Sequence, residues 1–322
     1  MKFFKTLLAA AIACSLFYTI NPETKTSVSE NEVPCVKQQT ALLNPGYTKS
    51  QVFTDLIPSD SKNTLVLCTD GSGALYDTIL IVSHSKKENK LCVTSLPRDI
   101  YVPYNEEICN QLDQLGLFTQ KGIFKLNATG SIGKLIHHKS NRFEHSEMAF
   151  MADILQEMTG IAVQEYAIVG FETFKKLVDT VGGVTVNVAC DIRTSEGTLL
   201  LPKGSQKLDG TQALIYARTR KFYDENGNTI PSGGDHTRKA HQLAMIQEVI
   251  PQLTQKSALA KLPQMIGILR KDVRHSFSIA EMYKYYRLAQ DVSSGKITLE
   301  TNLITGRVID PFHDGCAYLE FE

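Results

Sequence analysis

The sequence predicts an α/β fold built on a mixed β-sheet, and two observations support this. Short apolar runs of strand length alternate with longer segments in which apolar residues recur at helical spacing. The connection at residues 85–90, "SKKENK", is short and polar, which is typical of a hairpin between antiparallel strands. A chain that combines a hairpin with strand–helix–strand units is expected to form one mixed sheet.

Three strands are expected first, at residues 63–70, 77–85 and 90–96. Each is an almost uninterrupted apolar run ("NTLVLCTD", "DTILIVSHS" and "KLCVTSL"), as in strands that are buried on both faces. Residues 105–143 show no regular period and are expected to be irregular.

A helix is expected at residues 145–160, where Met148, Met151, Leu155 and Met158 recur at helical spacing before Gly160 ends the pattern. This methionine stripe is typical of core packing, not of a cofactor site. The later elements follow from the same signals: a strand at 163–170, a helix at 171–183, a strand at 184–190, a short helix at 209–221, a longer helix with Asp235 as its N-cap, and a helix at 278–290 with the capping box Ser278 and Glu281.

Composition limits the function classes. The 322 residues are 43% hydrophobic and 21% charged, which is typical of a globular protein and not of a disordered one. Lys plus Arg and Asp plus Glu both number 34, so the net charge is zero. This balance argues against a general nucleic-acid binder, and any site for an anion must therefore be local.

The N-terminal segment predicts export. Residues 1–20 combine Lys2 and Lys5 with an apolar run, as in a signal peptide or an uncleaved membrane anchor. "AAIAC", ending at Cys14, also resembles a lipoprotein processing site. All three alternatives place the mature domain outside the cytoplasm, whereas a buried N-terminal helix would not. Polar, proline-containing residues 21–60 are interpreted as a linker, and residues 61–322 as one domain.

The seven cysteines include no C-x-x-C pair, which argues against a zinc site or a dithiol redox motif. Asp70 and Asp77 flank the glycine-containing loop "GSGALY". Two carboxylates in this position can share Mg²⁺ with phosphate oxygens, although the spacing alone favours two ordinary turn residues. The loop is not a P-loop, because no G-K-[ST] follows it.

Cationic side chains gather in three further places. Arg98 and Asp99 directly follow Pro97, Lys125 lies in "KLN", and Arg218, Arg220 and Arg238 lie close together in the sequence. Guanidinium groups bind phosphate oxygens in a bidentate manner, although a single Arg is more often part of a solvated helix face. Because residues i and i+2 do not share a helix face, Arg218 and Arg220 cannot both be explained in that way. The residues alone therefore indicate an exported α/β domain with a possible pyrophosphate and metal site.

The motifs "LPRDIYVPY", "KLN", "LVDTVGGVTVNV", "LDGTQALIYARTR" and "DHTRKAHQ" occur in this order, and together they resemble the LytR-CpsA-Psr family of bacterial envelope proteins. The resemblance runs from about residue 62 to residue 250 and is looser beyond. It implies a three-layer α/β/α fold with a central mixed sheet and an apolar pocket for a polyprenyl chain. It also implies Mg²⁺-supported transfer of a glycopolymer from a polyprenyl-pyrophosphate carrier to peptidoglycan, commonly to a muramic acid 6-hydroxyl, with a phosphodiester as the product linkage.

The resemblance also implies residue roles. Asp70 and Asp77 match the two metal-binding aspartates, Arg98 and Asp99 the P-R-D motif, Lys125 the K-x-N motif, Arg218 and Arg220 the A-R-x-R pair, and Asp235, Arg238 and Gln242 the D-x-x-R-x-x-R-Q segment. Arg98 would then be one of several guanidinium groups around a pyrophosphate, and Asp99 would orient its neighbours.

Three positions depart from the family pattern: Ser72, Leu75 and His241 stand where Arg is usual. Each lost charge-assisted contact costs about 1.5–3 kcal/mol, and His84, His236 or Lys239 are candidates to compensate. Three hypotheses follow: an active transferase, a polyprenyl-pyrophosphate hydrolase that uses water as the acceptor, and a non-catalytic protein that binds lipid-linked glycan or cell wall. The retained Asp and Arg residues favour catalysis, and the departures favour its loss or change.

Overall fold

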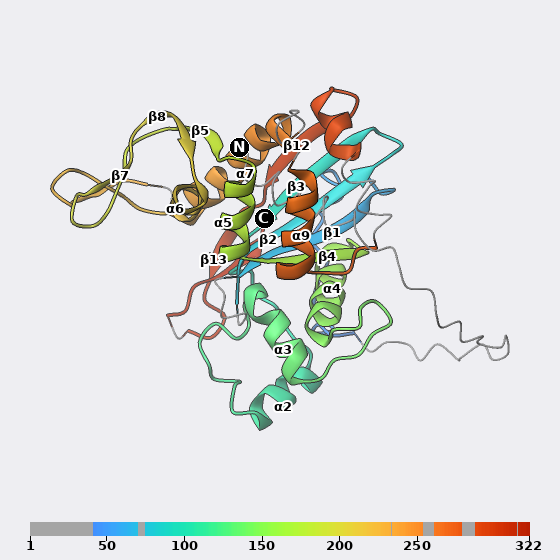
Figure 1. Ribbon diagram of the computed structural model, residues 1–322. Helices are drawn as coiled ribbons and strands as arrows, with labels where there is room; N and C mark the ends of the chain where they lie inside the picture. Colours follow the sequence, from blue (N-terminus) through green and yellow to red (C-terminus); the bar gives the residue numbers. More distant parts are fainter. Residues whose placement is uncertain (1–40, 70–74, 233, 254–260, 279–286, 314) are drawn as a thin grey trace.

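The computed structural model describes residues 41–69, 75–232, 234–253, 261–278, 287–313 and 315–322. Its centre is a six-stranded sheet in the order β11-β4-β1-β2-β3-β12 (Figure 1). These strands are β1 (Lys62–Thr69), β2 (Tyr76–Ser85), β3 (Lys90–Leu96), β4 (Glu165–Gly170), β11 (Arg274–His275) and β12 (Thr298–Leu303). β1, β2 and β3 pair antiparallel, whereas β4 pairs parallel with β1 and β12 pairs parallel with β3. The predicted mixed α/β sheet and its first three strands are thus confirmed.

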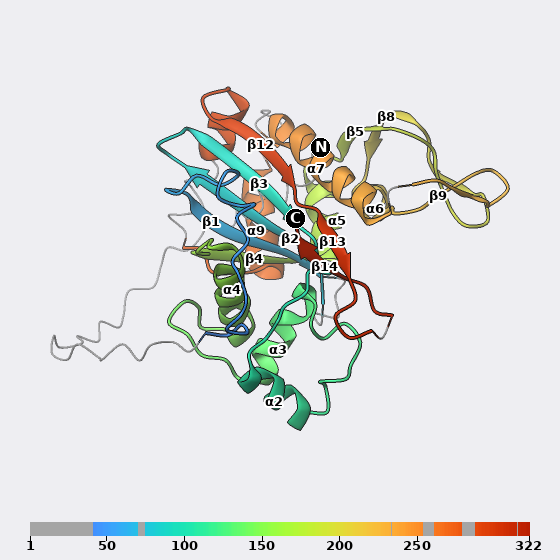
Figure 2. The same ribbon diagram turned by 180° about the vertical axis from the view of Figure 1, so that it is seen from behind.

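Side chains along β1 point alternately to the two faces of the sheet, and each face forms a hydrophobic core. Leu65 and Leu67 point to one face, Val66 to the other, and all three are completely buried. The face with Val66 is covered by α5 (Phe171–Thr180), α6 (Gly210–Arg218), α7 (Asp235–Leu253) and α9 (Leu262–Asp272). Figure 1 shows α5 and α9 in front of the sheet, and Figure 2 shows them behind it.

The opposite face is covered by α4 (Ser146–Thr159), together with the shorter helices α2 (Glu106–Gln114), α3 (Thr129–Leu135) and the 3₁₀ turn η1 (Leu126–Ala128). Met148, Met151, Leu155 and Met158 of α4 are buried, which confirms that the methionine stripe is core. Gly160 ends α4 in a left-handed conformation (φ 80°), as predicted. The two helical layers around one sheet form the three-layer α/β/α architecture.

Residues 105–143 are more regular than expected. The expectation of an irregular segment is wrong, because α2, η1 and α3 lie there. These helices have nine residues or fewer, and Gly130 and Gly133 interrupt α3, so no long periodic pattern marks them. Gly130 packs against the Tyr76 ring so closely that a Cβ there would lie 2.6 Å from it. Gly130 therefore allows α3 to pack closely on the sheet, and Gly133 allows it to pack closely on α4.

Residues 41–60 lie against the α4 side of the sheet. Leu43 and Phe53 are buried there, and the Glu157 carboxylate on α4 accepts the backbone N–H groups of Leu42 and Leu43 at 2.9–3.0 Å. The described packing thus begins at least as early as residue 41, whereas the leader at 1–20 and residues 21–40 lie outside the described residues. Among the helices that are described, none combines the length and apolar character needed to span a bilayer.

Short strand pairs complete the fold. An arm that projects from the sheet in both views carries β5 (Val184–Val188), β6 (Ile192–Arg193), β7 (Leu199–Leu201), β8 (Gly204–Leu208), β9 (Phe222–Tyr223) and β10 (Thr229–Ile230) (Figures 1 and 2). A separate hairpin consists of β13 (Gly306–Ile309) and β14 (Tyr318–Phe321). The capping box predicted at Ser278 and Glu281 falls mainly on residues outside the described part.

Candidate functional site

The site is organised around Asp77, which lies at a β-bulge. Cys68 of β1 pairs with Thr78 and Thr69 pairs with Tyr76, so Asp77 is the extra residue between these pairs. A bulge changes which face a side chain points to. Here Tyr76 is buried on the α4 face, whereas Asp77 and Thr78 both line a pocket on the opposite side. The bulge thus brings the carboxylate to the pocket while the ring beside it remains in the core.

Arg98 is placed opposite Asp77 by the register of the hairpin. Ile79 pairs with Leu96 in the antiparallel β2–β3 ladder, and two more residues along each strand lead to Asp77 and Arg98. Arg98 Nη1 donates to Asp77 Oδ1 at 2.5 Å. Arg98 and Asp99, which follow the apolar run of β3, therefore belong to a local ion-pair network with Asp77.

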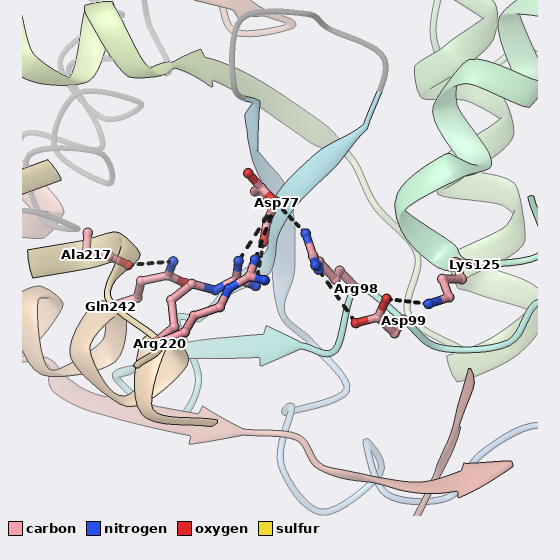
Figure 3. A network of polar contacts seen from close by, with 8 residues as sticks. Asp77, Arg98, Asp99, Lys125, Ala217, Arg220 and Gln242 are labelled. Atoms are coloured by element: carbon pink, nitrogen blue, oxygen red, sulfur yellow. Dashed lines mark hydrogen bonds and ion pairs between the residues drawn. The ribbon is translucent and has the colours of Figure 1, made fainter. Parts of the chain in front are cut away.

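Two further guanidinium groups reach the same carboxylate from the helical layer (Figure 3). Arg220, just after α6, lies 3.8 Å from Asp77 Oδ1. Arg238, in the first turn of α7, also lies 3.8 Å from Oδ1, and it donates to the Asp77 backbone carbonyl at 3.2 Å. Arg238 is only 4% exposed, so these partners offset part of the cost of burying its charge. Three arginines that are far apart in the sequence thus meet at one oxygen.

Asp99 and Lys125 continue the network on the other side of Arg98 (Figure 3). Lys125 Nζ donates to Asp99 Oδ1 at 3.0 Å, and Asp99 Oδ2 lies 3.6 Å from Arg98 Nε. Asn127 is buried, and its backbone N–H donates to the Arg98 carbonyl at 3.0 Å. The "KLN" segment therefore runs beside the residues after Pro97 and fixes Lys125 next to them.

A small, mostly apolar pocket with a cavity volume of about 40 Å³ opens beside these charges. Phe171 and Phe174 of α5 and Leu214 and Ala217 of α6 form its apolar side. Its polar lining comes from Asp77, Thr78, Arg218, Arg238 and Gln242. The site can therefore receive an anionic group that is joined to an apolar chain.

Cys68, at the end of β1, also lines this pocket. Burial raises the pKa of its thiol to about 12, so the thiol is protonated at neutral pH and is not a thiolate nucleophile.

Arg218 and Gln242 have different positions from the other predicted residues. The Arg218 guanidinium lies over the Phe171 ring, 4.5 Å from its centroid, at the rim of the pocket. Gln242 Nε2 donates to the Ala217 carbonyl at 3.3 Å. Gln242 therefore holds the end of α6, from which Arg218 and Arg220 extend.

The departures from the family pattern can be placed only in part. His241 stacks on Tyr216 with ring centroids 4.4 Å apart, and its Nδ1 lies 3.2 Å from the Tyr216 carbonyl oxygen. Burial lowers the pKa of His241, so it adds no positive charge at neutral pH. Leu75 is 49% exposed just before β2. Ser72 and Asp70 lie outside the described residues.

Two other expectations need correction. α7 begins at Asp235, and Gly234 accepts the Arg238 backbone N–H, so Asp235 is the first helical residue and not the N-cap. The side chains of Asp235 and His236 lie outside the described part. His84 pairs with Lys62 at the far end of β2, roughly 20 Å from Asp77 at 3.3 Å per residue, and cannot compensate for a missing arginine.

The residues present are compatible with a divalent cation. All three arginines lie within 4 Å of Asp77 Oδ1. A carboxylate oxygen next to a phosphate site is an ordinary Mg²⁺ ligand. Within the described ranges no group of three His, Cys, Asp or Glu side chains could hold a metal, so any such ion needs other oxygens, from phosphate or from Asp70.

Comparison with known proteins agrees with this fold. A model of the LytR_cpsA_psr family matches residues 19–321. "Biofilm regulatory protein A" of Streptococcus mutans is 29% identical over 210 residues, which are 63% of this chain and 45% of that protein. "Polyisoprenyl-teichoic acid–peptidoglycan teichoic acid transferase TagU" of Bacillus subtilis is 26% identical over 214 residues, 66% of this chain and 58% of that protein. The matches thus span about half the length of these relatives.

Among solved structures, B. subtilis TagV superposes with a TM-score of 0.59 at 20% identity. The match covers 83% of this chain and 92% of the TagV chain. At this identity the similarity establishes the fold and not the substrate.

Proposed function

Because the chain belongs to the LytR_cpsA_psr family, we propose that it transfers a glycopolymer from a polyprenyl-pyrophosphate carrier to a hydroxyl group of peptidoglycan. The hydroxyl oxygen attacks the phosphorus that carries the glycan, and the bond from that phosphorus to the bridging oxygen breaks. The products are a glycan joined to the wall by a phosphodiester and a polyprenyl phosphate, and the hydroxyl proton is released to water.

The convergence of Arg98, Arg220 and Arg238 on Asp77 carries this proposal. With Lys125 and Arg218, five cationic side chains lie around two carboxylates among the described residues, Asp77 and Asp99, an excess of three positive charges that Asp70 would reduce to two. In a protein whose net charge is zero, this excess is local. A pyrophosphate diester carries two negative charges, and phosphoryl transfer depends mainly on positioning and charge neutralisation.

The cationic groups have different roles in the proposal. Arg98, Arg220 and Arg238 form a clamp that Asp77 preorganises while no ligand is bound. Lys125 binds a phosphate oxygen, and Asp99 orients Lys125 and Arg98. Asp77, with Asp70 at the other end of the same loop, would hold Mg²⁺, which when bound would neutralise phosphate oxygens. Gln242 positions the end of α6, Arg218 closes the rim of the pocket, and Asp235 is assigned to the catalytic group by its motif alone.

The apolar pocket fits the other part of such a carrier. Phe171, Phe174 and Leu214 lie next to the guanidinium groups, so they would contact the start of the lipid chain while the pyrophosphate stays among the arginines. The transferase name of the relative TagU supports this substrate class. In the same proposal, the leader at residues 1–20 exports or anchors the domain on the outer face of the membrane.

The proposal can be tested with the full chain in detergent. A polyprenyl pyrophosphate that carries a short glycan is incubated with Mg²⁺ and a peptidoglycan fragment, and the release of polyprenyl phosphate is measured. We expect Arg98→Ala to lower the rate at least tenfold, since it removes one charge-assisted contact of about 1.5–3 kcal/mol. Arg307→Ala is the matched control, because Arg307 of β13 forms an exposed ion pair with Glu320 of β14.

The outcomes separate the hypotheses. Release that needs both Arg98 and the peptidoglycan fragment supports a transferase. Release that is unchanged without the fragment indicates a hydrolase. Saturable lipid binding without any release indicates a non-catalytic protein and contradicts the proposal.

A further inference from the structure

The strand β14 lies directly beside residues 99–101, which follow Arg98 in the candidate site. The Leu319 N–H donates to the Asp99 carbonyl at 2.9 Å, and the Tyr101 N–H donates to the Leu319 carbonyl at 2.8 Å. On the other edge of the same segment, the Leu126 N–H donates to the Ile100 carbonyl at 2.8 Å. Asp99 therefore directly precedes Ile100 and Tyr101, which form β-bridges to Leu319 of β14 and to Lys125.

Tyr318, the first residue of β14, contacts Lys125 directly. Lys125 Nζ lies over the Tyr318 ring, 5.4 Å from its centroid, within the range of a cation–π interaction. The ring is 1% exposed and makes edge-to-face contacts with Tyr101 at 5.6 Å and with Phe312 at 5.8 Å. The Gly122 N–H donates to the Tyr318 hydroxyl at 3.3 Å. The ring thus cannot move away from the ammonium group without breaking other contacts.

These contacts leave Lys125 with a donor for a ligand. The ammonium group has three N–H bonds, and the flexible stem of lysine normally lets them point in many directions. Here one N–H donates to Asp99 and the Tyr318 ring face occupies a second direction. Among the described residues, no hydrogen bond or ion pair takes the third N–H. A ring also attracts the cation without neutralising it, whereas a second carboxylate would cancel its charge.

We propose that Tyr318 is a positioning residue, whose ring holds the Lys125 ammonium group against Asp99 so that it can bind a pyrophosphate oxygen. This inference rests on the proposed function, because it assigns Lys125 to the same anion. It adds to the site a residue of the C-terminal hairpin, far from the sequence motifs that mark the arginine clamp.

The test measures the affinity of the full chain for inorganic pyrophosphate with Mg²⁺ by calorimetry. Tyr318→Leu removes the ring and Tyr318→Phe retains it. Lys125→Met removes the charge and retains the apolar stem, and the double variant completes a cycle. Phe321→Leu is the matched control, because this aromatic residue of the same strand packs on Phe53 at 5.2 Å and does not contact Lys125.

We expect Tyr318→Leu to weaken pyrophosphate binding about fivefold, which is about 1 kcal/mol at 1.4 kcal/mol per tenfold. Tyr318→Phe and Phe321→Leu should remain within about twofold of the wild type. In the Lys125→Met background, Tyr318→Leu should have almost no further effect on binding. Circular dichroism at the assay temperature shows whether each variant is folded.

Equal losses of affinity for Tyr318→Leu and Phe321→Leu would overturn the inference, because they would indicate a structural role only. Additive effects of Tyr318→Leu and Lys125→Met would also overturn it. The same cycle measured by urea unfolding reports the Tyr318–Lys125 contact without any ligand, and its absence would reject the positioning. If the wild type does not bind pyrophosphate, the proposed function fails and the assigned role fails with it, even where the urea cycle shows coupling.

Discussion

Asp77→Asn tests the idea that Asp77 is an internal counterion that a pyrophosphate replaces. Asparagine has almost the same shape, so the bulge and the packing can remain, but the negative charge is lost. Arg98 would lose an ion pair of 2.5 Å, and Arg220 and Arg238 would each lose a partner at 3.8 Å. Arg238 is the critical partner, because its guanidinium is buried and cannot turn into water.

The expected magnitude follows from these distances. At an effective dielectric constant of about 20, two charges at 3.8 Å attract each other with about 4 kcal/mol, before the cost of desolvation. Breaking a buried pair by removing one partner typically costs about 3–5 kcal/mol. Asp77, Arg98 and Arg220 are partly exposed, so we expect Asp77→Asn to lower the free energy of unfolding by about 2–3 kcal/mol.

The same reasoning predicts an increase in affinity. Without Mg²⁺, pyrophosphate should bind Asp77→Asn more tightly than the wild type, because it no longer competes with a carboxylate for the guanidinium groups. A pyrophosphate concentration of about one hundred times its dissociation constant adds about 2.7 kcal/mol of stability, enough to restore most of the loss. With Mg²⁺ present, pyrophosphate should bind the wild type more tightly than Asp77→Asn, since Asp77 is a proposed ligand of the ion.

Urea unfolding with and without pyrophosphate measures both effects. The control is Asp272→Asn, which removes an ion pair of 2.7 Å with the exposed Lys176 and should cost less than about 1 kcal/mol. An Asp77→Asn protein that is as stable as the wild type, with unchanged pyrophosphate affinity, would refute the counterion role.

Three other predictions concern residues around the site. Leu75→Arg places a guanidinium at an exposed position beside β2 and should raise turnover of a polyprenyl-pyrophosphate substrate; no gain in a steady-state assay would indicate a reshaped site. Burial lowers the pKa of His241, so its contribution to stability is complete above about pH 6.5 and is lost as the pH falls through its folded-state pKa. Urea midpoints at pH 5 and pH 8 should therefore differ less for His241→Gln than for the wild type, and equal differences would contradict this. Because burial raises the pKa of Cys68 to about 12, iodoacetamide at pH 8 should alkylate Cys68 more slowly than the exposed Cys190, as peptide mass spectrometry can show; equal rates would contradict its burial.

The sequence predicts the sheet well where burial alone determines the element. The apolar runs that become β1, β2 and β3 are long and uninterrupted, and the polar turn between β2 and β3 fixes their antiparallel pairing. β12 escaped prediction, because its residues are only partly buried at the sheet edge and alternate without a strong pattern. α2 and α3 were missed because packing against the sheet stabilises them, and packing leaves no periodic signal in so few residues.

The candidate site, too, could be predicted only in part from the sequence. Residue type and motif order indicated the arginines, but they could not show that Arg220 and Arg238 share one carboxylate oxygen while Arg218 lies over Phe171. Those positions depend on the end of α6, which Gln242 holds through the Ala217 carbonyl. No sequence signal marked Tyr318, since an aromatic residue in a short strand usually belongs to the core. Tyr318 belongs to the core and also contacts Lys125.

The bulge at Asp77 explains how one strand serves both the core and the site. In a regular strand, Asp77 would share a face with Ile79 and lie in the core beneath α4, where an unpaired carboxylate is very costly. The extra residue lets Tyr76 take the core position and turns Asp77 toward the three arginines. Deleting Leu75 would not remove this register shift, because the pairs on either side involve Thr69 and Cys68. The position of the carboxylate is therefore a property of the β1–β2 pairing.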